Sequence, residues 1–280
     1  MEQGWGTVLA AAARKWRRDE AARLAAALSF YTVFSLTPLV LLTLAVLSTL
    51  FGEEAARGLI GERLGDFVGP ERAGLIEQLA ESASRPEAGR YAGPIGFLSV
   101  LWGASAIAGE LKASLNRVFD APPPASGLVP ALRGRLISMA FVLSLGFVLL
   151  VSLVLGAGAA AAGKFFGGAL GLGEAPLHAF NEGAAMLVNA LLFTAMFRLL
   201  PDARVAWREA AAGGAFTSVM FTLGSLALGL YLGKAGPASA YGAAGALVAF
   251  VVWTYYCAQI LYFGAEFTAA YARARRAAAS

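Results

Sequence analysis

Residues 24–52 read LAAALSFYTVFSLTPLVLLTLAVLSTLFG, without a charged side chain between Arg23 and Glu53. A helix needs roughly 20 apolar residues to cross a bilayer core about 30 Å thick, and the segment 28–51 is long enough. The segment also runs too long, and begins too far into the chain, to be the apolar region of a secretory signal peptide. We therefore expect a transmembrane helix here.

The composition of the whole chain extends this expectation. Of its 280 residues, 58% are hydrophobic and 14% are charged, and the mean hydropathy is +0.65. A soluble domain carries about 25% charged residues, because water must solvate its surface. The chain has one cysteine, Cys257, and one histidine, His178, which excludes a disulfide framework and a histidine-based zinc centre. The composition predicts an integral membrane protein.

Five more apolar stretches follow the first, and together they predict an all-α polytopic membrane protein with six transmembrane helices. The expected spans lie near residues 28–51, 93–111, 136–163, 180–200, 210–232 and 241–271. The transmembrane domain, 28–271, would follow a basic amphipathic segment at 1–27 and precede a basic tail at 272–280. Residues 52–92 are too long for a simple turn. Their apolar residues recur at helical spacing on either side of the Gly69-Pro70 break, which predicts an external amphipathic helical hairpin, either a packing lid or a substrate gate.

The distribution of lysine and arginine sets the orientation of this topology. Of the 22 basic residues, 15 fall in the N-terminal segment, the second-to-third and fourth-to-fifth connections and the tail. The positive-inside rule therefore places both termini in the cytoplasm. The net charge of +4 is explained by these cytoplasmic segments, so we expect contacts with membrane lipids and none with nucleic acid.

The residues that enzymes use for chemistry do not form a recognisable pattern. The sequence has no phosphate-binding P-loop, no G-x-S-x-G and no H-E-x-x-H. His178 stands apart from any group of carboxylates, and Cys257 reads as a small packing residue within the sixth span. We expect no catalytic residues, no cofactor, no metal and no enzymatic activity.

Polar residues at membrane depth are the main candidates for function. Charged groups there are costly, and they usually face a bundle interior or a water-filled cavity. Four of the six expected helices offer such groups to one cytoplasmic layer. The candidates for binding a substrate or an ion, or for a polar network, are Tyr31, Glu110, Asn116, Arg117, Arg198 and Glu266.

Two interpretations of this layer stay open. In the first, Glu110 and Glu266 are neutralised by Arg198, Arg117 or Arg208 in a network that locks the bundle. In the second, they line an inward-facing pocket for an ion, a proton or a substrate head group. Small residues at Gly213, Gly214 and Thr217 (and similarly at Gly242, Gly245 and Ala249) are expected to let helices pack closely.

Four stretches together resemble the YihY/BrkB family of bacterial membrane proteins: ALSFYTVFSLTP at 27–38, LWGAS to NRVF at 101–119, FRLLPD at 197–202 with Trp207, and YG, WTYY and GAE within 241–266. Their order and spacing fit nearly the whole chain. The resemblance implies an inner-membrane protein with about six spans, whose early ribonuclease label is regarded as a misassignment. Positions that match the family pattern are Asn116, Arg198, Pro201, Gly242, Trp253 and Glu266.

The sequence favours a permease that is not driven by ATP and handles lipid or another amphiphile through a cytoplasm-facing polar pocket. Its substrate would be an unidentified small molecule or lipid. The alternative is a scaffold of the cell envelope that transports nothing, and in either case a homo-oligomer stays open. A nuclease would need clustered acids in an aqueous domain, and no segment is large enough to form one.

Overall fold

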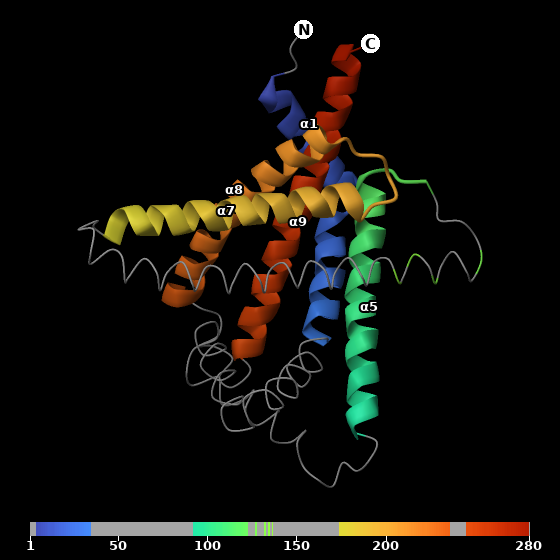
Figure 1. Cartoon of the computed structure of the whole chain (residues 1–280), viewed down its shortest axis with the longest axis vertical. Coiled ribbons are helices and arrows are strands. Elements are labelled where there is room, and N and C mark those ends of the chain that lie inside the picture. Colours follow the sequence, from blue (N-terminus) through green and yellow to red (C-terminus); the bar gives the residue numbers. More distant parts are fainter. Residues whose placement is uncertain are drawn as a thin grey trace. The chain divides into compact units, whose positions relative to one another are not determined.

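The computed structural model describes residues 4–34, 92–122, 174–235 and 245–279, with four single positions between 127 and 136. These residues form helices and connecting turns, with no strand among them. The labelled helices are α1 (Trp5–Arg18), α5 (Ala92–Val118), α7 (Glu174–Leu199), α8 (Trp207–Ala235) and α9 (Gly245–Ala279) (Figure 1). A further helix, Ala21–Phe34, follows α1. The expected all-α class is confirmed for the described part of the chain.

Two helical stretches, Trp207–Leu228 and Val248–Ala278, are long and apolar enough to cross a membrane. Ala21–Phe34 and Gly183–Leu199 are apolar but shorter. Large apolar side chains on these helices are exposed, including Phe34, Leu191, Leu223 and Leu226, as expected of a surface that meets lipid. The expected spans at 210–232 and 241–271 thus coincide with membrane-capable helices, and the total of six stays a prediction.

Several expected elements lie outside the described residues. They are the hairpin at 52–92 except for its last residue, most of the span at 136–163 and the part of the first span beyond residue 34. The helix Ala21–Phe34, which contains the start of that span, begins seven residues before the expected residue 28, because the chain turns at Asp19 and Glu20. The span expected at 93–111 corresponds to α5, which continues to Val118.

The chain divides into two compact units. The first consists of residues 1–24, 108–226 and 259–280, and the second of 25–107 and 227–258. In the second unit, the Ser29 hydroxyl lies 2.7 Å from the Thr254 hydroxyl and donates to the Val251 carbonyl at 3.2 Å. These bonds join the helix Ala21–Phe34 to α9, as expected for buried hydroxyls in an apolar helix pair.

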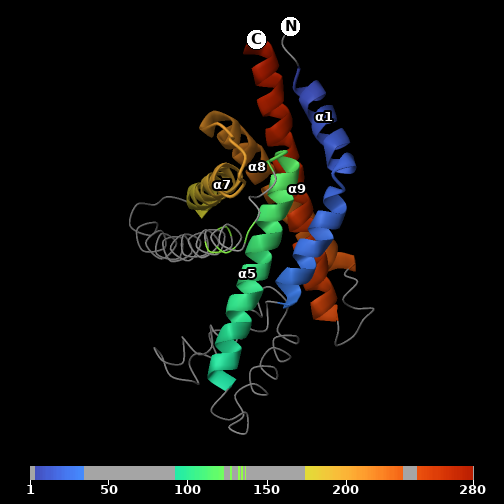
Figure 2. The same ribbon diagram turned by 90° about the vertical axis from the view of Figure 1, so that its right-hand side faces the viewer.

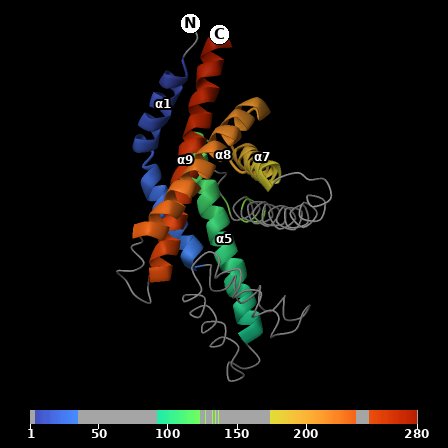
Figure 3. The same cartoon turned by 90° about the vertical axis from the view of Figure 1, so that its left-hand side faces the viewer.

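In the first unit, α1 lies beside the C-terminal part of α9, and Figure 2 and Figure 3 show both chain ends at the same end of this helix pair. The contact is apolar: Val8 and Ala12 of α1 form a buried cluster with Phe267 and Ala270 of α9. The Trp5 ring also stacks on Phe267 and Tyr271, with centroids 6.3 and 5.9 Å away.

α7 runs crosswise to this part of α9 (Figure 1) and packs against α8. The Ser218 hydroxyl of α8 donates to the Met186 carbonyl of α7 at 2.7 Å. A β-carbon on Gly214 would meet the Thr194 side chain and the Ala190 carbonyl. The span expected at 180–200 therefore corresponds to a helix fixed against α8, and its passage through a bilayer stays a prediction.

Candidate functional site: a buried charge cluster and its cavity

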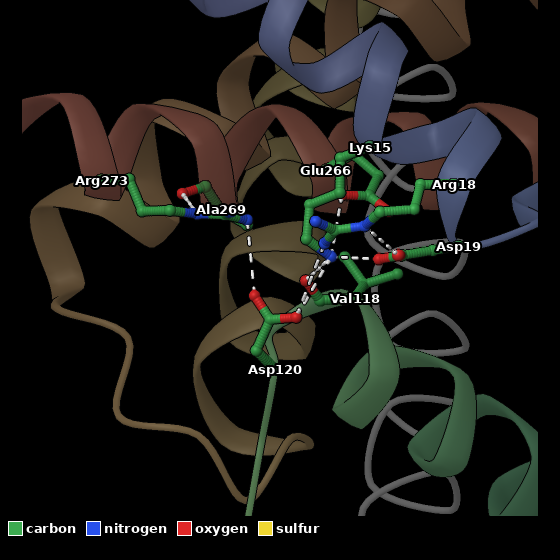
Figure 4. Close-up of polar contacts among 8 residues, drawn as sticks. All are labelled: Lys15, Arg18, Asp19, Val118, Asp120, Glu266, Ala269 and Arg273. Atoms are coloured by element: carbon green, nitrogen blue, oxygen red, sulfur yellow. Dashed lines mark hydrogen bonds and ion pairs between the residues drawn. The ribbon is translucent and has the colours of Figure 1, made fainter.

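Glu266 of α9 is fully buried, and its carboxylate meets an ammonium group from the N-terminal helix (Figure 4). The Lys15 Nζ lies 3.4 Å from the Glu266 Oε2. The sequence analysis considered Arg117, Arg198 and Arg208 as counter-ions, and the structure instead pairs Glu266 with Lys15. Within the described residues, the cation at ion-pair distance from Glu266 is Lys15 and none of the three arginines, and Glu110 accepts a hydrogen bond from Ser114.

Lys15 is the centre of the cluster, with only 5% of its side chain exposed. Its ammonium donates to the Asp19 carboxylate and, at 2.7 Å, to the Val118 carbonyl. It also lies 3.6 Å from the Asp120 Oδ1. Since Val118 is the last residue of α5, Lys15 caps the negative end of that helix, where a cation is favoured. One lysine thus joins α1, α5 and α9.

Two arginines surround the cluster on its exposed side. Arg18 approaches Asp19, with Nε 3.1 Å from Oδ1, and Asp120, at 3.9 Å. Arg273 of α9 lies 3.6 Å from the other oxygen of Asp120. The cluster of Lys15, Arg18, Asp19, Asp120, Glu266 and Arg273, which we call the Lys15 cluster, balances three cationic groups with three carboxylates.

Two helix ends bring these charges together. α5 ends in a Schellman motif, in which Asp120 N–H donates to the Arg117 carbonyl and Ala121 N–H to the Asn116 carbonyl. Asp120 occupies the left-handed position of this motif, with φ 50°. At the end of α1, Glu20 adopts the same left-handed conformation, with φ 54°, directly after Asp19. Aspartate tolerates this conformation better than most residues, which suits Asp120; at the end of α1 the left-handed residue is Glu20, and Asp19 before it has φ −84°.

Asp19 is held in its charged form. Its partial burial, the largest single influence, would raise its pKa, but the hydrogen bonds and charges of Lys15 and Arg18 together outweigh burial and lower the pKa. The carboxylate therefore stays ionised beside Lys15 at neutral pH.

A second polar contact joins α5 to the α7–α8 connection. The Asn116 amide donates to the Asp202 Oδ2 at 2.8 Å and accepts from the Asp202 N–H at 2.7 Å. The Lys112 Nζ lies 2.8 Å from the Asp202 Oδ1. Partial burial would raise the Asp202 pKa, but the Lys112 and Asn116 hydrogen bonds and the Lys112 charge lower it. Asn116 therefore helps to hold the α7–α8 connection against α5.

The other predicted residues make contacts that do not involve the Lys15 cluster. Glu110 is half-buried and accepts a hydrogen bond from Ser114 at 3.2 Å. Arg198 is half-buried and lies over the Trp207 ring, 5.7 Å from its centroid. Arg117 is exposed, and Tyr31 belongs to the second unit, where its ring meets Phe30 edge-on. Of the six candidates, Glu266 belongs to the Lys15 cluster, and the polar layer expected from the sequence stays a prediction.

A cavity of about 530 Å³ adjoins the exposed side of the Lys15 cluster. The α7–α8 connection contributes Arg204 and Val205, α9 contributes Arg273 and Arg276, and the end of α5 contributes Asp120. Asp120 and Arg273 therefore belong to both the cavity and the Lys15 cluster. Within the described residues, no group of three histidine, cysteine or acidic side chains could hold a metal ion.

Sequence reasoning missed Lys15, Asp19 and Asp120, although α1 carries a signal for two of them. Val8, Ala12, Lys15 and Asp19 recur at intervals of three and four residues and share one helix face. A lysine that continues an apolar stripe is a candidate for burial with a partner. Asp120, which follows the end of α5, has no comparable signal in the sequence.

The sequence profile of the family described as Virulence factor BrkB matches residues 12–280. The chain belongs to this family. Among its BrkB relatives are proteins named UPF0761 membrane protein: one in Rhodospirillum centenum is 28% identical over 94% of this chain and 57% of the relative. One in Methylibium petroleiphilum is 29% identical over 95% of the chain and 62% of the relative, and one in Verminephrobacter eiseniae is 27% identical over 95% and 62%.

The chain therefore spans about three-fifths of the length of these curated relatives. No solved structure matches it. Family membership confirms the resemblance found in the sequence, and the names of the relatives identify a membrane protein.

Proposed function

We propose that this BrkB-family protein is a permease that moves an amphiphile across or within the membrane, and that the Lys15 cluster is part of its polar pocket. The observation that carries the proposal is the continuity between a fully buried ion pair and a cavity. Glu266 contacts Lys15, Lys15 contacts Asp120, and Asp120 contacts Arg273 at the cavity wall. A ligand that enters the cavity therefore meets a chain of charges leading into the bundle.

The energetics of burial support a working role for this pair. Removing two charges from water costs several kcal/mol per ion, and apolar residues of similar volume often stabilise a fold as well or better. Ionisable groups at membrane depth commonly mark substrate, ion or proton pathways. A bundle that needed only stability would gain little from Lys15 and Glu266, so we assign them to the movement of a ligand or proton.

The proposal places the protein in a bacterial inner membrane as a multi-pass protein with cytoplasmic termini. The basic residues of the N-terminal segment, the connections and the tail support this orientation. The Lys15 cluster and the cavity include residues of α1, the end of α5 and the C-terminal part of α9, which belong to or adjoin these basic segments, so in this orientation they would face the cytoplasm. Membrane lipids are its proposed partners, and no enzymatic step is assigned to it.

A scaffold that transports nothing is the second candidate, and the packing of α8 on α9 favours it. Glycines and threonines lock these helices at close range, as suits a rigid assembly. The two candidates differ in what the Lys15 cluster does. In a scaffold, a substitution that removes a charge from the Lys15 cluster would change only the stability of the protein.

The test is transport by the purified full chain in proteoliposomes, with fluorescent phospholipids and ion-sensitive dyes as probes. We expect wild-type flux above that of empty vesicles for at least one probe, and about tenfold or greater loss with Glu266→Gln. Glu209→Gln is the matched control, because Glu209 is also buried but accepts from the Ala206 N–H at the start of α8.

Reconstituted amounts and thermal unfolding are compared for all variants. Glu266→Asp, which keeps the charge, extends the test if Glu266→Gln does not fold. Wild-type flux equal to that of empty vesicles for every probe would refute the permease and leave the scaffold. Equal flux through wild type and well-folded Glu266→Gln would remove the Lys15 cluster from the mechanism.

A further inference from the structure

The cavity beside the Lys15 cluster is built like an anion-binding site. Three arginines line it, Arg204, Arg273 and Arg276, against one carboxylate, Asp120. Its volume of about 530 Å³ lies within the ordinary range for small-ligand pockets. A fixed excess of two positive charges in such a space favours an anion with several oxygen atoms, because guanidinium groups bind phosphate through paired hydrogen bonds.

The arginines on α9 are already oriented. One face of the helix lines the cavity with two alanines and two arginines, Ala269, Ala272, Arg273 and Arg276. The small alanines leave space beside the long arginine side chains. Arg273 Nε donates to the Ala269 carbonyl at 3.2 Å, and Arg276 Nε donates to the Ala272 carbonyl at 3.3 Å. Each side chain is thereby fixed to its own helix through Nε, which lowers the entropy cost of binding through its terminal nitrogens.

Asp120 occupies part of this site from within the protein. Its Oδ2 lies 3.6 Å from Arg273, and its Oδ1 lies 3.6 Å from Lys15. Among the described residues, no carboxylate lies within ion-pair distance of Arg204 or Arg276. The side chain of Asp120 is 59% exposed and can rotate away from Arg273 into water.

We propose that the cavity binds a phosphate-bearing anion, either the head group of an anionic phospholipid or free phosphate, which replaces Asp120 on Arg273. The apolar wall of Phe119, Pro122 and Val205 offers contacts to the carbon atoms of a lipid next to its phosphate. Displacement frees the Asp120 Oδ2 from Arg273, and because the Oδ1 of the same carboxylate lies 3.6 Å from Lys15, occupancy of the cavity is linked to the Lys15–Glu266 ion pair. The proposal names the ligand class of the proposed permease, although binding itself does not depend on transport.

The experiment measures binding to the full chain in detergent by calorimetry. The probes are dihexanoyl phosphatidylglycerol, dihexanoyl phosphatidylcholine and sodium phosphate. We expect phosphatidylglycerol or phosphate to bind, with affinity falling as salt rises, and phosphatidylcholine to bind at least about tenfold more weakly than phosphatidylglycerol. Binding of phosphatidylglycerol with none of phosphate identifies a head-group site, and comparable binding of both identifies a site for the phosphate alone.

Two substitutions move the affinity in opposite directions. Arg273→Gln combined with Arg276→Gln should weaken binding about tenfold or more, since two charge-assisted contacts are lost. Asp120→Asn should strengthen it about threefold to tenfold, because the internal competitor loses its charge while asparagine keeps the left-handed conformation. Arg275→Gln is the matched control for Arg276→Gln alone, because each removes one positive charge from the same helix turn and Arg275 does not line the cavity.

The outcomes separate this proposal from the permease. If the double arginine variant binds the probes as tightly as Arg275→Gln does, the cavity is not the binding site. If the double variant does not fold, Arg276→Gln alone is compared with Arg275→Gln in the same way. If Asp120→Asn binds no more tightly than wild type, the displacement of Asp120 is wrong. Binding without flux refutes the permease alone, whereas flux without binding refutes this site alone.

Discussion

Thr217 of α8 packs directly onto Gly264 of α9, at a point where a β-carbon on residue 264 would collide with the threonine side chain. The relationship is reciprocal, because Thr268 of α9 covers Gly213 of α8 in the same way. Each threonine hydroxyl donates to a carbonyl on its own helix, Thr217 to Gly213 and Thr268 to Gly264, both at 2.7 Å. The two helices thus pack at close range while their hydroxyls remain satisfied.

We expect Gly264→Ala to destabilise the protein by about 1–3 kcal/mol, because the added methyl group must push Thr217 and the α8 backbone aside. Thermal unfolding of the detergent-solubilised chain measures the loss. The control is Gly183→Ala in α7, where a β-carbon would meet nothing within 4 Å. That variant should be neutral or gain up to about 1 kcal/mol from better helix propensity. Equal effects of the two alanines would contradict the close crossing.

The Lys15–Glu266 pair predicts an asymmetry between its two members. In the described part of the chain, Glu266 has one cation within ion-pair distance, whereas Lys15 also meets Asp19, Asp120 and the Val118 carbonyl. Lys15→Met should therefore cost about 3–5 kcal/mol by leaving a buried carboxylate unpaired. Glu266→Gln should cost distinctly less, and it should restore part of the stability lost in Lys15→Met.

A double-mutant cycle by thermal unfolding measures this coupling between Lys15 and Glu266. Lys112→Met is the control, because Lys112 pairs with the more exposed Asp202 and should cost about 1 kcal/mol or less. Additive effects of Lys15→Met and Glu266→Gln would show that the two groups do not interact in the folded protein.

The long apolar stretches of the sequence predicted helices that the described residues contain, because a stretch long enough to cross a bilayer is recognisable from composition alone. The described parts of the stretches expected at 93–111 and 241–271 are helical throughout, in α5 and α9. The glycines at 213 and 214 were expected to allow close packing, and the contacts with Thr268 and Thr194 confirm it. Helix ends were less accurate, since caps and charged turns decide them locally.

The partners of the charged residues could not be predicted in the same way. Spacing along one helix places Glu266 at a certain depth, but the cation beside it comes from a residue 251 positions earlier. Basic residues of the N-terminal segment were assigned to the membrane surface as a group. The distinction between Lys15, which is buried, and Arg18, which is exposed, depends on which face of α1 packs against α9.

Stability should depend on pH through Asp202. Its pKa is lower in the folded protein than the ordinary value of 3.8, because Lys112 and Asn116 stabilise the ionised carboxylate. The unfolded chain lacks these contacts. The resulting stabilisation is present above that ordinary value and is lost as pH falls through the lower, folded value. Unfolding curves between pH 5 and pH 3 should show this loss. The loss should be smaller in Asp202→Asn and partly reduced in Asn116→Ala; identical slopes in all three proteins would contradict it.

The turn between α1 and the next helix offers a stabilising substitution. Glu20 has φ 54°, a conformation that costs a residue with a β-carbon about 1–2 kcal/mol and costs glycine little. Its ion pair with Arg23, at 2.8 Å, joins two exposed side chains and contributes little. Glu20→Gly should therefore raise the stability of the protein by about 1 kcal/mol. Glu20→Ala removes the same ion pair but keeps the β-carbon, so it should give no gain. If thermal unfolding finds the alanine variant as stable as the glycine variant, the cost assigned to the left-handed conformation of Glu20 is wrong.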